Sequence, residues 1–155
     1  MKKVLVLLLL LFSFSAFGQA RYNLAGLKSV KIEVLDEYGC LNKQITQKLI
    51  AECTYKLSSV GILVTEKNPV AALQFRIDLN KSSGFADPRV MLRLELLEKV
   101  QTFRTASIRT DAKTYSISSL VSFPADSLAN DIYAFYVDRL FLDFINKWIE
   151  DNPKS

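Results

Sequence analysis

The closing stretch of the chain constrains the fold more than any other segment. Residues 128–153 read LANDIYAFYVDRLFLDFINKWIEDNP, and their large apolar side chains recur at helical spacing. At about 1.5 Å per residue, a helix of this length crosses a whole small domain. Its continuous stripe comprises Tyr133, Val137, Leu140, Phe141, Phe144 and Trp148. We expect this stripe to pack on a sheet.

The same stretch carries more apolar surface than one sheet can cover. Two further groups point to other sides of the predicted helix: Leu128, Ile132, Phe135 and Tyr136 in its first half, and Leu142, Ile145 and Ile149 in its second. Either the first helix and residues 24–27 cover the remainder, or an exposed patch is left for a partner. Charged residues recur throughout residues 131–147, which excludes a membrane span.

Four segments alternate between apolar and polar residues, as strands with one buried face do. They cover residues 29–36, 72–80, 89–102 and 107–118, and residues 62–65 form a shorter extended piece. The alternation slips at Leu96 and Leu97, which predicts a β-bulge or a bend. The fourth segment carries charge at alternate positions, which is typical of an edge strand.

An amphipathic helix is predicted between the first two of these segments. Asn42 is a suitable N-cap, and Gly61 can adopt the left-handed conformation that ends a helix. Between them one face is apolar: Ile45, Leu49, Cys53, Leu57 and Val60. The final helix begins at Asp126 or Ser127 as N-cap.

Because each strand is apolar on one side only, both helices must cover the same face of the sheet. We therefore predict an α+β fold, a two-layer sandwich of about four mainly antiparallel strands with two helices packed on one face. A chain of this length suits a single domain, for which we expect residues 19–155.

Residues 1–18 are predicted to be a signal peptide. They begin MKK, continue with a short apolar run and end in small residues, a pattern typical of export signals. Cleavage after Gly18 is favoured, cleavage after Ala20 is an alternative, and an uncleaved anchor is the remaining one. No cysteine precedes Cys40, so an N-terminal lipid is not expected. The predicted location is the periplasm, or the exterior, of a Gram-negative bacterium, and the protein is not expected to be a lipoprotein.

Composition argues against several classes of function. Removing residues 1–18 takes away two of the 20 basic residues and none of the 16 acidic ones, so no concentrated basic face remains for nucleic acid. The chain has no histidine, the commonest general base and metal ligand. No phosphate-binding, hydrolase or calcium-loop motif occurs, and the paired carboxylates fall on predicted turns and helix surfaces. We expect no catalytic residue, no metal and no cofactor; an enzyme is the third hypothesis.

Two surfaces are candidates for binding a partner. The uncovered face of the sheet would carry Arg76, Arg93 and Arg109 among mixed charges, and arginine suits interfaces through its planar fork. The alternative is an ordinary solvated surface. The second candidate is the excess apolar surface of the final helix, made by Phe135, Leu142, Ile145 and Ile149.

The two cysteines are predicted to stay separate. Cys53 falls on the apolar stripe of the first helix, whereas Cys40 precedes that helix. Their separation would exceed the roughly 7 Å that a disulfide can span between Cα atoms. Two separate thiols are therefore favoured over a bridge.

The export signal, the VKIEVL and LQFRIDL segments and the closing VDRLFLDFINKWIEDNP make the chain similar to a diffuse group of small uncharacterised bacterial periplasmic proteins. In outline it also resembles the two-helix, four-strand envelope proteins that help to assemble outer-membrane components. The leading hypothesis is an exported periplasmic, non-enzymatic module that binds an envelope protein or macromolecular partner, or that self-associates. The alternative is a carrier of a small ligand or lipid held between helices and sheet.

Overall fold

The computed structural model describes residues 24–80, 88–101 and 109–153. The predicted signal peptide therefore lies outside the described residues. The elements are β1 (Ser29–Asp36), α2 (Lys43–Val60), β2 (Leu63–Val64), β3 (Ala71–Asn80), β4 (Arg89–Gln101), β5 (Arg109–Ser122), α3 (Leu128–Phe135), the π-helical segment η2 (Tyr136–Leu140) and α4 (Phe141–Asp151).

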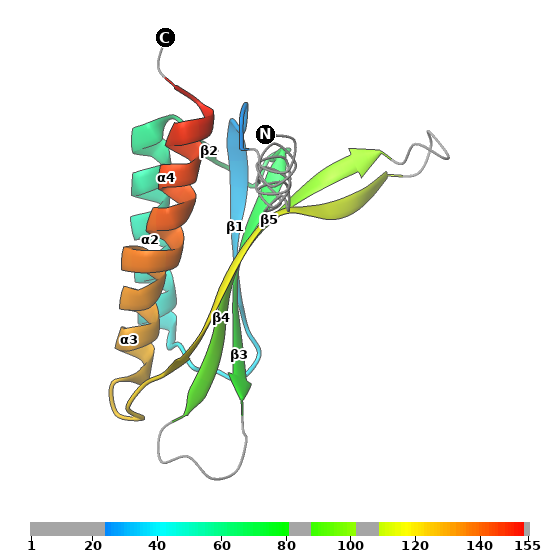
Figure 1. Ribbon diagram of the computed structural model, residues 1–155. Helices are drawn as coiled ribbons and strands as arrows, with labels where there is room; N and C mark the ends of the chain where they lie inside the picture. The colour runs from blue at the N-terminus through cyan, green and yellow to red at the C-terminus, as the bar shows by residue number, and fades with distance from the viewer. Residues whose placement is uncertain (1–23, 81–87, 102–108, 154–155) are drawn as a thin grey trace, which may run out of the picture.

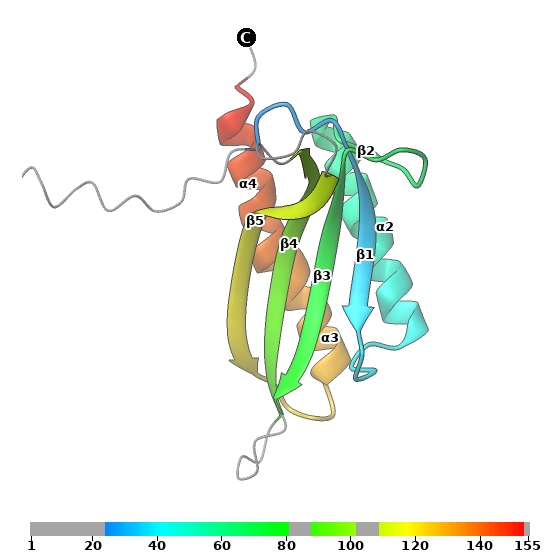
Figure 2. The same ribbon diagram turned by 90° about the vertical axis from the view of Figure 1, so that its right-hand side faces the viewer.

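One five-stranded sheet has the order β2-β1-β3-β4-β5. β1 runs parallel to β2 and β3, whereas β3, β4 and β5 form an antiparallel meander. The helices lie together on one side of the sheet and leave the other side uncovered (Figures 1 and 2). The predicted α+β two-layer sandwich is confirmed. The two-residue β2 is the extra strand, and it covers only the start of the outer edge of β1.

Local sequence signals account for the ends of α2. The side chain of Asn42 accepts a hydrogen bond of 2.9 Å from the backbone N–H of Ile45, as an N-cap does. At the other end Gly61 adopts φ 93°, and its N–H reaches the carbonyls of Leu57 and Ser58. Leu49, Cys53 and Leu57 are buried on the predicted face.

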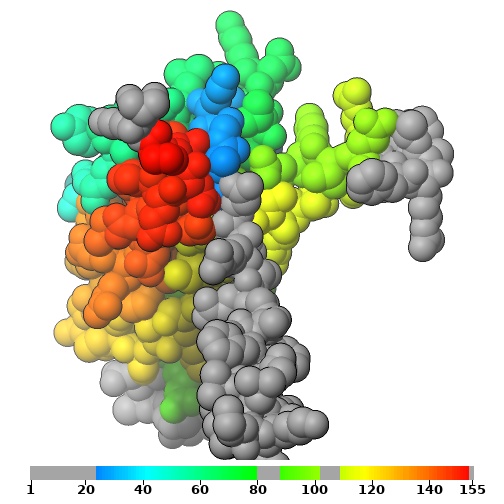
Figure 3. All heavy atoms as spheres, turned by 45° about the horizontal axis from the view of Figure 1, so that its top comes forward, coloured from blue at the N-terminus to red at the C-terminus, as the bar shows by residue number. Residues whose placement is uncertain are grey.

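The register of β4 against β5 shifts between Leu96 and Leu97, so the predicted bulge or bend at this position is confirmed. Beyond the bulge the ends of β4 and β5 turn away from the sheet as a two-stranded arm (Figure 1). The space-filling view shows this arm standing out from the body of the molecule (Figure 3). Bulges increase local strand twist, which explains the departure at this point.

The closing helix differs from the prediction in its phase. It runs as α3, η2 and α4, and the π segment takes more residues per turn than an α-helix does. A uniform advance of 100° per residue therefore fails across residues 136–140. Ile132 and Tyr136, expected on a second side, are fully buried in the core, whereas Tyr133 is only partly buried.

Aromatic rings fill the space between the two layers. Phe75 of β3 meets Tyr136 edge to face with ring centroids 5.1 Å apart, and Phe144 meets Tyr115 of β5 at 5.3 Å. Phe141 stacks beside Phe144 at 6.2 Å. Such pairs bury large apolar area in preferred geometries. The rings occupy the region in which the carrier hypothesis placed a ligand.

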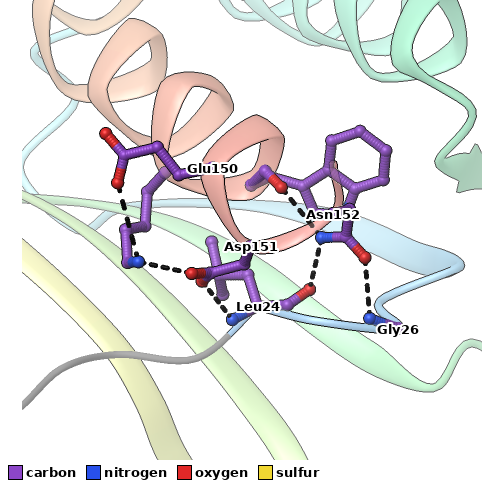
Figure 4. A network of polar contacts seen from close by, with 7 residues as sticks. Leu24, Gly26, Glu150, Asp151 and Asn152 are labelled. Atoms are coloured by element: carbon purple, nitrogen blue, oxygen red, sulfur yellow. Dashed lines mark hydrogen bonds and ion pairs between the residues drawn. The ribbon is translucent and has the colours of Figure 1, made fainter. Parts of the chain in front are cut away.

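The two ends of the described domain are tied together beside the core. A carboxylate oxygen of Asp151 accepts the N–H of Leu24 at 2.8 Å, and the amide of Asn152 accepts the N–H of Gly26 at 2.9 Å (Figure 4). The Asn152 amide also donates to the Leu24 carbonyl at 3.1 Å. Leu24 is thereby held in the core with 2 % of its surface exposed. We call this set of contacts the terminal clasp.

The cysteines remain two separate thiols, as predicted: Cys40 is half-buried and Cys53 is buried. Within the described ranges, no helix combines the length and the apolar character needed to cross a membrane.

Candidate functional site

The uncovered face of the sheet holds the most concentrated polar chemistry of the described residues. Because side chains alternate along a strand, the buried Leu73, Phe75 and Ile77 of β3 leave Gln74 and Arg76 on the opposite side. The register then places residues of four strands in rows across this face. One row is Glu33, Gln74, Glu95 and Ser116, and the next is Leu35, Arg76, Arg93 and Ser118.

Both carboxylates of the first row have partners on the same face. The Gln74 amide donates to a carboxylate oxygen of Glu33 at 2.7 Å, and Lys31 forms an ion pair with the same carboxylate. Glu95 is only 2 % exposed and receives the ammonium of Lys113 at 2.5 Å. A buried carboxylate needs such a partner, because an unpaired charge is costly to desolvate.

The Lys31 contact changes the acid strength of Glu33. The hydrogen bond from Lys31 lowers the pKa of the Glu33 carboxyl below its ordinary value, and the bond from Gln74 lowers it further, while burial acts in the opposite direction. The same hydrogen bond raises the pKa of Lys31. Both groups are therefore held in their charged forms near neutral pH.

The second row brings two arginines face to face. Arg76 of β3 and Arg93 of β4 are direct partners in the antiparallel register. Arg93 forms an ion pair with Asp78, whereas no carboxylate of the described residues forms an ion pair with Arg76. Like charges directly opposite each other destabilise a strand pair. Among the described residues, this arginine pair therefore has one more guanidinium group than it has carboxylate partners.

Three side-chain atoms on this face are buried without a hydrogen-bond partner: Gln74 Oε1, Arg76 Nε and Arg93 Nε. Buried polar atoms in native proteins almost always have a partner. The three belong to neighbouring positions of β3 and β4, so the unsatisfied donors and acceptor are concentrated in one place.

Tyr136 supports the arginine pair from the helix side of the sheet. Its hydroxyl donates to the backbone carbonyl of Arg76 at 2.6 Å and lies 3.3 Å from that of Arg93. Burial raises the pKa of Tyr136 far above its ordinary value, so the hydroxyl remains a donor. The backbone beneath both guanidinium groups is thus linked to the closing helix.

A hollow of about 480 Å³ adjoins the first row on the same face. It lies between the loop that follows β2 and the β4–β5 arm, and its lining includes Lys31, Glu33, Glu66, Gln74, Lys99 and Asp111. Small-molecule pockets of this volume are mostly apolar. The mixed charges of this hollow are instead suited to polar contacts.

The structure brings some of the predicted site residues together and separates others. Arg76 and Arg93 are neighbours, but Arg109 faces Gln101 on the arm, about 30 Å along β5 from the arginine row. Phe135 is partly buried and packs edge to face on Phe123. Ile145 is 8 % exposed and belongs to the core.

Leu142 and Ile149 are the two members of the predicted apolar group that remain on the surface, with 46 % and 49 % of their areas exposed.

The sequence did not predict the roles of Gln74, Glu95 and Tyr136. Alternation did place Gln74 and Glu95 on this face, but their burial depends on neighbouring strands.

The described residues contain no group of three or more His, Cys, Asp or Glu side chains arranged to hold a metal ion. The arrangement is suited to binding acidic and polar groups.

No protein-family model matches the chain, and no curated protein matches it. Solved structures do. The PelC dodecamer from Paraburkholderia phytofirmans is 14 % identical with a TM-score of 0.41, over 74 % of this chain and 86 % of that one. Lipoprotein GNA1162 from Neisseria meningitidis is 12 % identical with a TM-score of 0.38, over 76 % and 98 %. A minor lipoprotein from Acinetobacter baumannii is 13 % identical with a TM-score of 0.35, over 77 % and 94 %.

These likenesses are consistent with the predicted resemblance to small bacterial α/β proteins. They contradict the predicted localisation, because two of the three proteins are lipoproteins by name. The prediction of a periplasmic or secreted protein that is not a lipoprotein is therefore withdrawn. It relied on the absence of a cysteine before Cys40.

Proposed function

We propose that this chain is an exported, non-enzymatic module of the cell envelope that binds a protein partner through the uncovered face of its sheet. Residues 19–155 would form the module, and residues 1–18 would direct its export. The contact would centre on the row that contains Arg76 and Arg93.

The excess guanidinium of Arg76 is the observation that carries the proposal. On the same face Lys31, Arg93 and Lys113 each have a carboxylate partner, and Arg76 has none within the described residues. A carboxylate of a partner protein, placed against the terminal nitrogens of the Arg76 guanidinium, would balance the charge that has no partner within the described residues. Arginine binds carboxylates through two parallel hydrogen bonds, which gives such a contact direction as well as strength.

The packing of the core favours this proposal over a ligand carrier. A carrier would hold its ligand between helices and sheet, where Phe75, Tyr136 and Phe141 already pack against one another. The available hollow lies on the other side of the sheet and is lined by charged residues. We therefore propose the uncovered face as the contact surface.

Site-specific photo-crosslinking in the cells that produce the protein tests the proposal. A photoreactive residue at position 118, beside Arg93 in the register, should yield a discrete adduct with another protein. Arg76→Met should reduce that adduct at least about tenfold, since truncating one side of a buried charge pair costs 2 kcal/mol or more. Arg139→Met changes an exposed arginine on the opposite layer and should leave the adduct unchanged.

Absence of any protein adduct at position 118 would count against the proposal. So would equal adduct yields from the two arginine variants, because the loss would then not depend on the arginine row. A small molecule that co-purifies in native mass spectrometry and disappears with Arg76→Met would replace the proposal with the carrier function.

A further inference from the structure

β5 forms one edge of the sheet, and its charge is confined to one half. Arg109, Asp111 and Lys113 occupy the arm, whereas residues 114–125 contain no charged side chain. Charged residues on an edge strand discourage pairing with another strand. The arm is protected in this way, and the part of β5 that lies along the body of the sheet is not.

The opposite edge of the sheet, formed by β2 and β1, does carry charged side chains. β2 covers β1 only at Ser29 and Val30. The rest of β1 carries Lys31 and Glu33, which form an ion pair, and ends at Asp36. Among the described strands, the uncharged half of β5 is therefore the one long stretch of sheet edge without charge protection.

Side chains in the uncharged half of β5 alternate between the uncovered face and the helix side of the sheet. Ser118, Leu120 and Ser122 are exposed on the uncovered face, and Leu120 keeps 50 % of its surface in solvent. Ile117 and Val121 are partly buried on the helix side, where they pack against the core. No described strand pairs with the outer edge of β5. A partner strand could therefore continue the sheet without moving a buried side chain.

We propose that β5 pairs antiparallel with β5 of a second copy of this chain, about a two-fold axis at Ser119. This inference does not depend on the proposed function. Opposed residues of antiparallel strands point to the same face, so this register places Ile117 against Val121 on the helix side. On the uncovered face it places Ser118 against Leu120. The two sheets become one, with the helices of both copies on the same side.

The same register favours a second copy of this chain as the strand that pairs with the edge of β5. The strand is self-complementary: apolar side chains meet apolar ones on the helix side, and serine and leucine meet on the other side. Each Lys113 lies opposite position 125 of the second copy, beyond the end of its β5 at Ser122. The charged half of each strand thus projects past the other copy, and no like charges are brought together.

Cysteine crosslinking in a Cys40→Ser background tests the register. Cysteines at position 119 would face each other with Cα atoms about 5 Å apart, close enough for a disulfide. Cysteines at position 122 would be offset by six residues, about 20 Å, and could not join. Mild oxidation of the full chain should therefore give a covalent dimer with Ser119→Cys and none with Ser122→Cys.

Sedimentation velocity over a concentration series is the second measurement, because it needs no cysteine. The unchanged protein should show a dimer that Leu120→Lys abolishes and Thr110→Lys, on the charged half of the same strand, leaves intact. A protein that stays monomeric at all concentrations overturns the inference, as do equal disulfide yields at positions 119 and 122. If a monomeric protein captures a different protein and Leu120→Lys removes that capture, the edge binds a foreign strand and self-pairing is refuted.

Discussion

At the scale of single residues, the degree of burial sets the reactivity of the two cysteine thiols. Burial of Cys53 on the inner face of α2 raises its thiol pKa to about 12. Cys40 is half-buried after β1; its burial also raises its pKa, and the neighbouring carboxylate of Asp36 raises it further. Only the thiolate reacts as a nucleophile, so both thiols are slow and the buried one is the slower.

We expect an alkylating reagent to label Cys40 in the native protein and to label Cys53 only after unfolding. Mass spectrometry of the intact chain after timed exposure to iodoacetamide measures this order. Cys40→Ser should abolish native labelling. Rapid native labelling of Cys53 would mean that α2 opens far more readily than its packing implies.

Tyr136→Phe should destabilise the domain by about 1 to 2 kcal/mol, because the carbonyls of Arg76 and Arg93 lose the hydroxyl that reaches them. Chemical denaturation measures the loss. Tyr133→Phe is the matched control, since Tyr133 contacts Lys48 through its ring and not through its hydroxyl. An equal effect of the two substitutions would show that the hydroxyl of Tyr136 does not contribute.

At the scale of elements, the closing helix packs on the core because a π-helical segment interrupts its α-helical geometry. The π segment lets Ile132 before it, Tyr136 at its start, and Phe141 and Phe144 after it all face the same core. A π segment amounts to one extra residue in an α-helix. Removing one residue inside it should therefore preserve the phase on both sides.

Deletion of the exposed Arg139 should be tolerated, with a change in unfolding free energy below about 1 kcal/mol, because the segment can revert to an α-helix. Deletion of the exposed Asn146 in α4 should cost several kcal/mol, since it turns Trp148 and the terminal clasp by about 100°. Thermal unfolding monitored by circular dichroism compares the two. Equal losses would contradict this account of the π segment.

At the scale of the whole molecule, the terminal clasp closes the domain by joining its first described residues to its last helix. The N–H of Leu24 lowers the pKa of Asp151, and Lys147 lowers it further through a contact of 2.5 Å. Because the folded pKa lies below the unfolded one, the Asp151 carboxylate stabilises the fold above its unfolded pKa. That contribution is lost as the pH falls through the folded pKa.

Asp151→Asn should lower the unfolding free energy by about 1 kcal/mol near neutral pH and by progressively less below about pH 4. Denaturation curves over a pH series measure the convergence of variant and parent. Glu150→Gln, at a carboxylate whose side chain is 72 % exposed, should change neither the stability nor its pH dependence. A constant difference between parent and Asp151→Asn at all pH values would rule out the linkage.

Local signals determined much of this structure. The alternation of residues 72–80 and 29–36, the caps at Asn42 and Gly61, and the slip at Leu96 each depend on near neighbours in the chain, so the sequence predicts them. The fold class followed, because strands with one apolar side require all helices on that side.

Other features depend on contacts between distant segments, which no local pattern encodes. The opposition of Arg76 and Arg93 depends on the register between β3 and β4, and the burial of Glu95 depends on Lys113 of β5. The π segment has no spacing signal, since a uniform helical period places Tyr136 outside the core. The sequence alone therefore determined the elements and their layering. The tertiary structure decided which arginine is left without a carboxylate and which sheet edge is left open, because only packing sets register and burial.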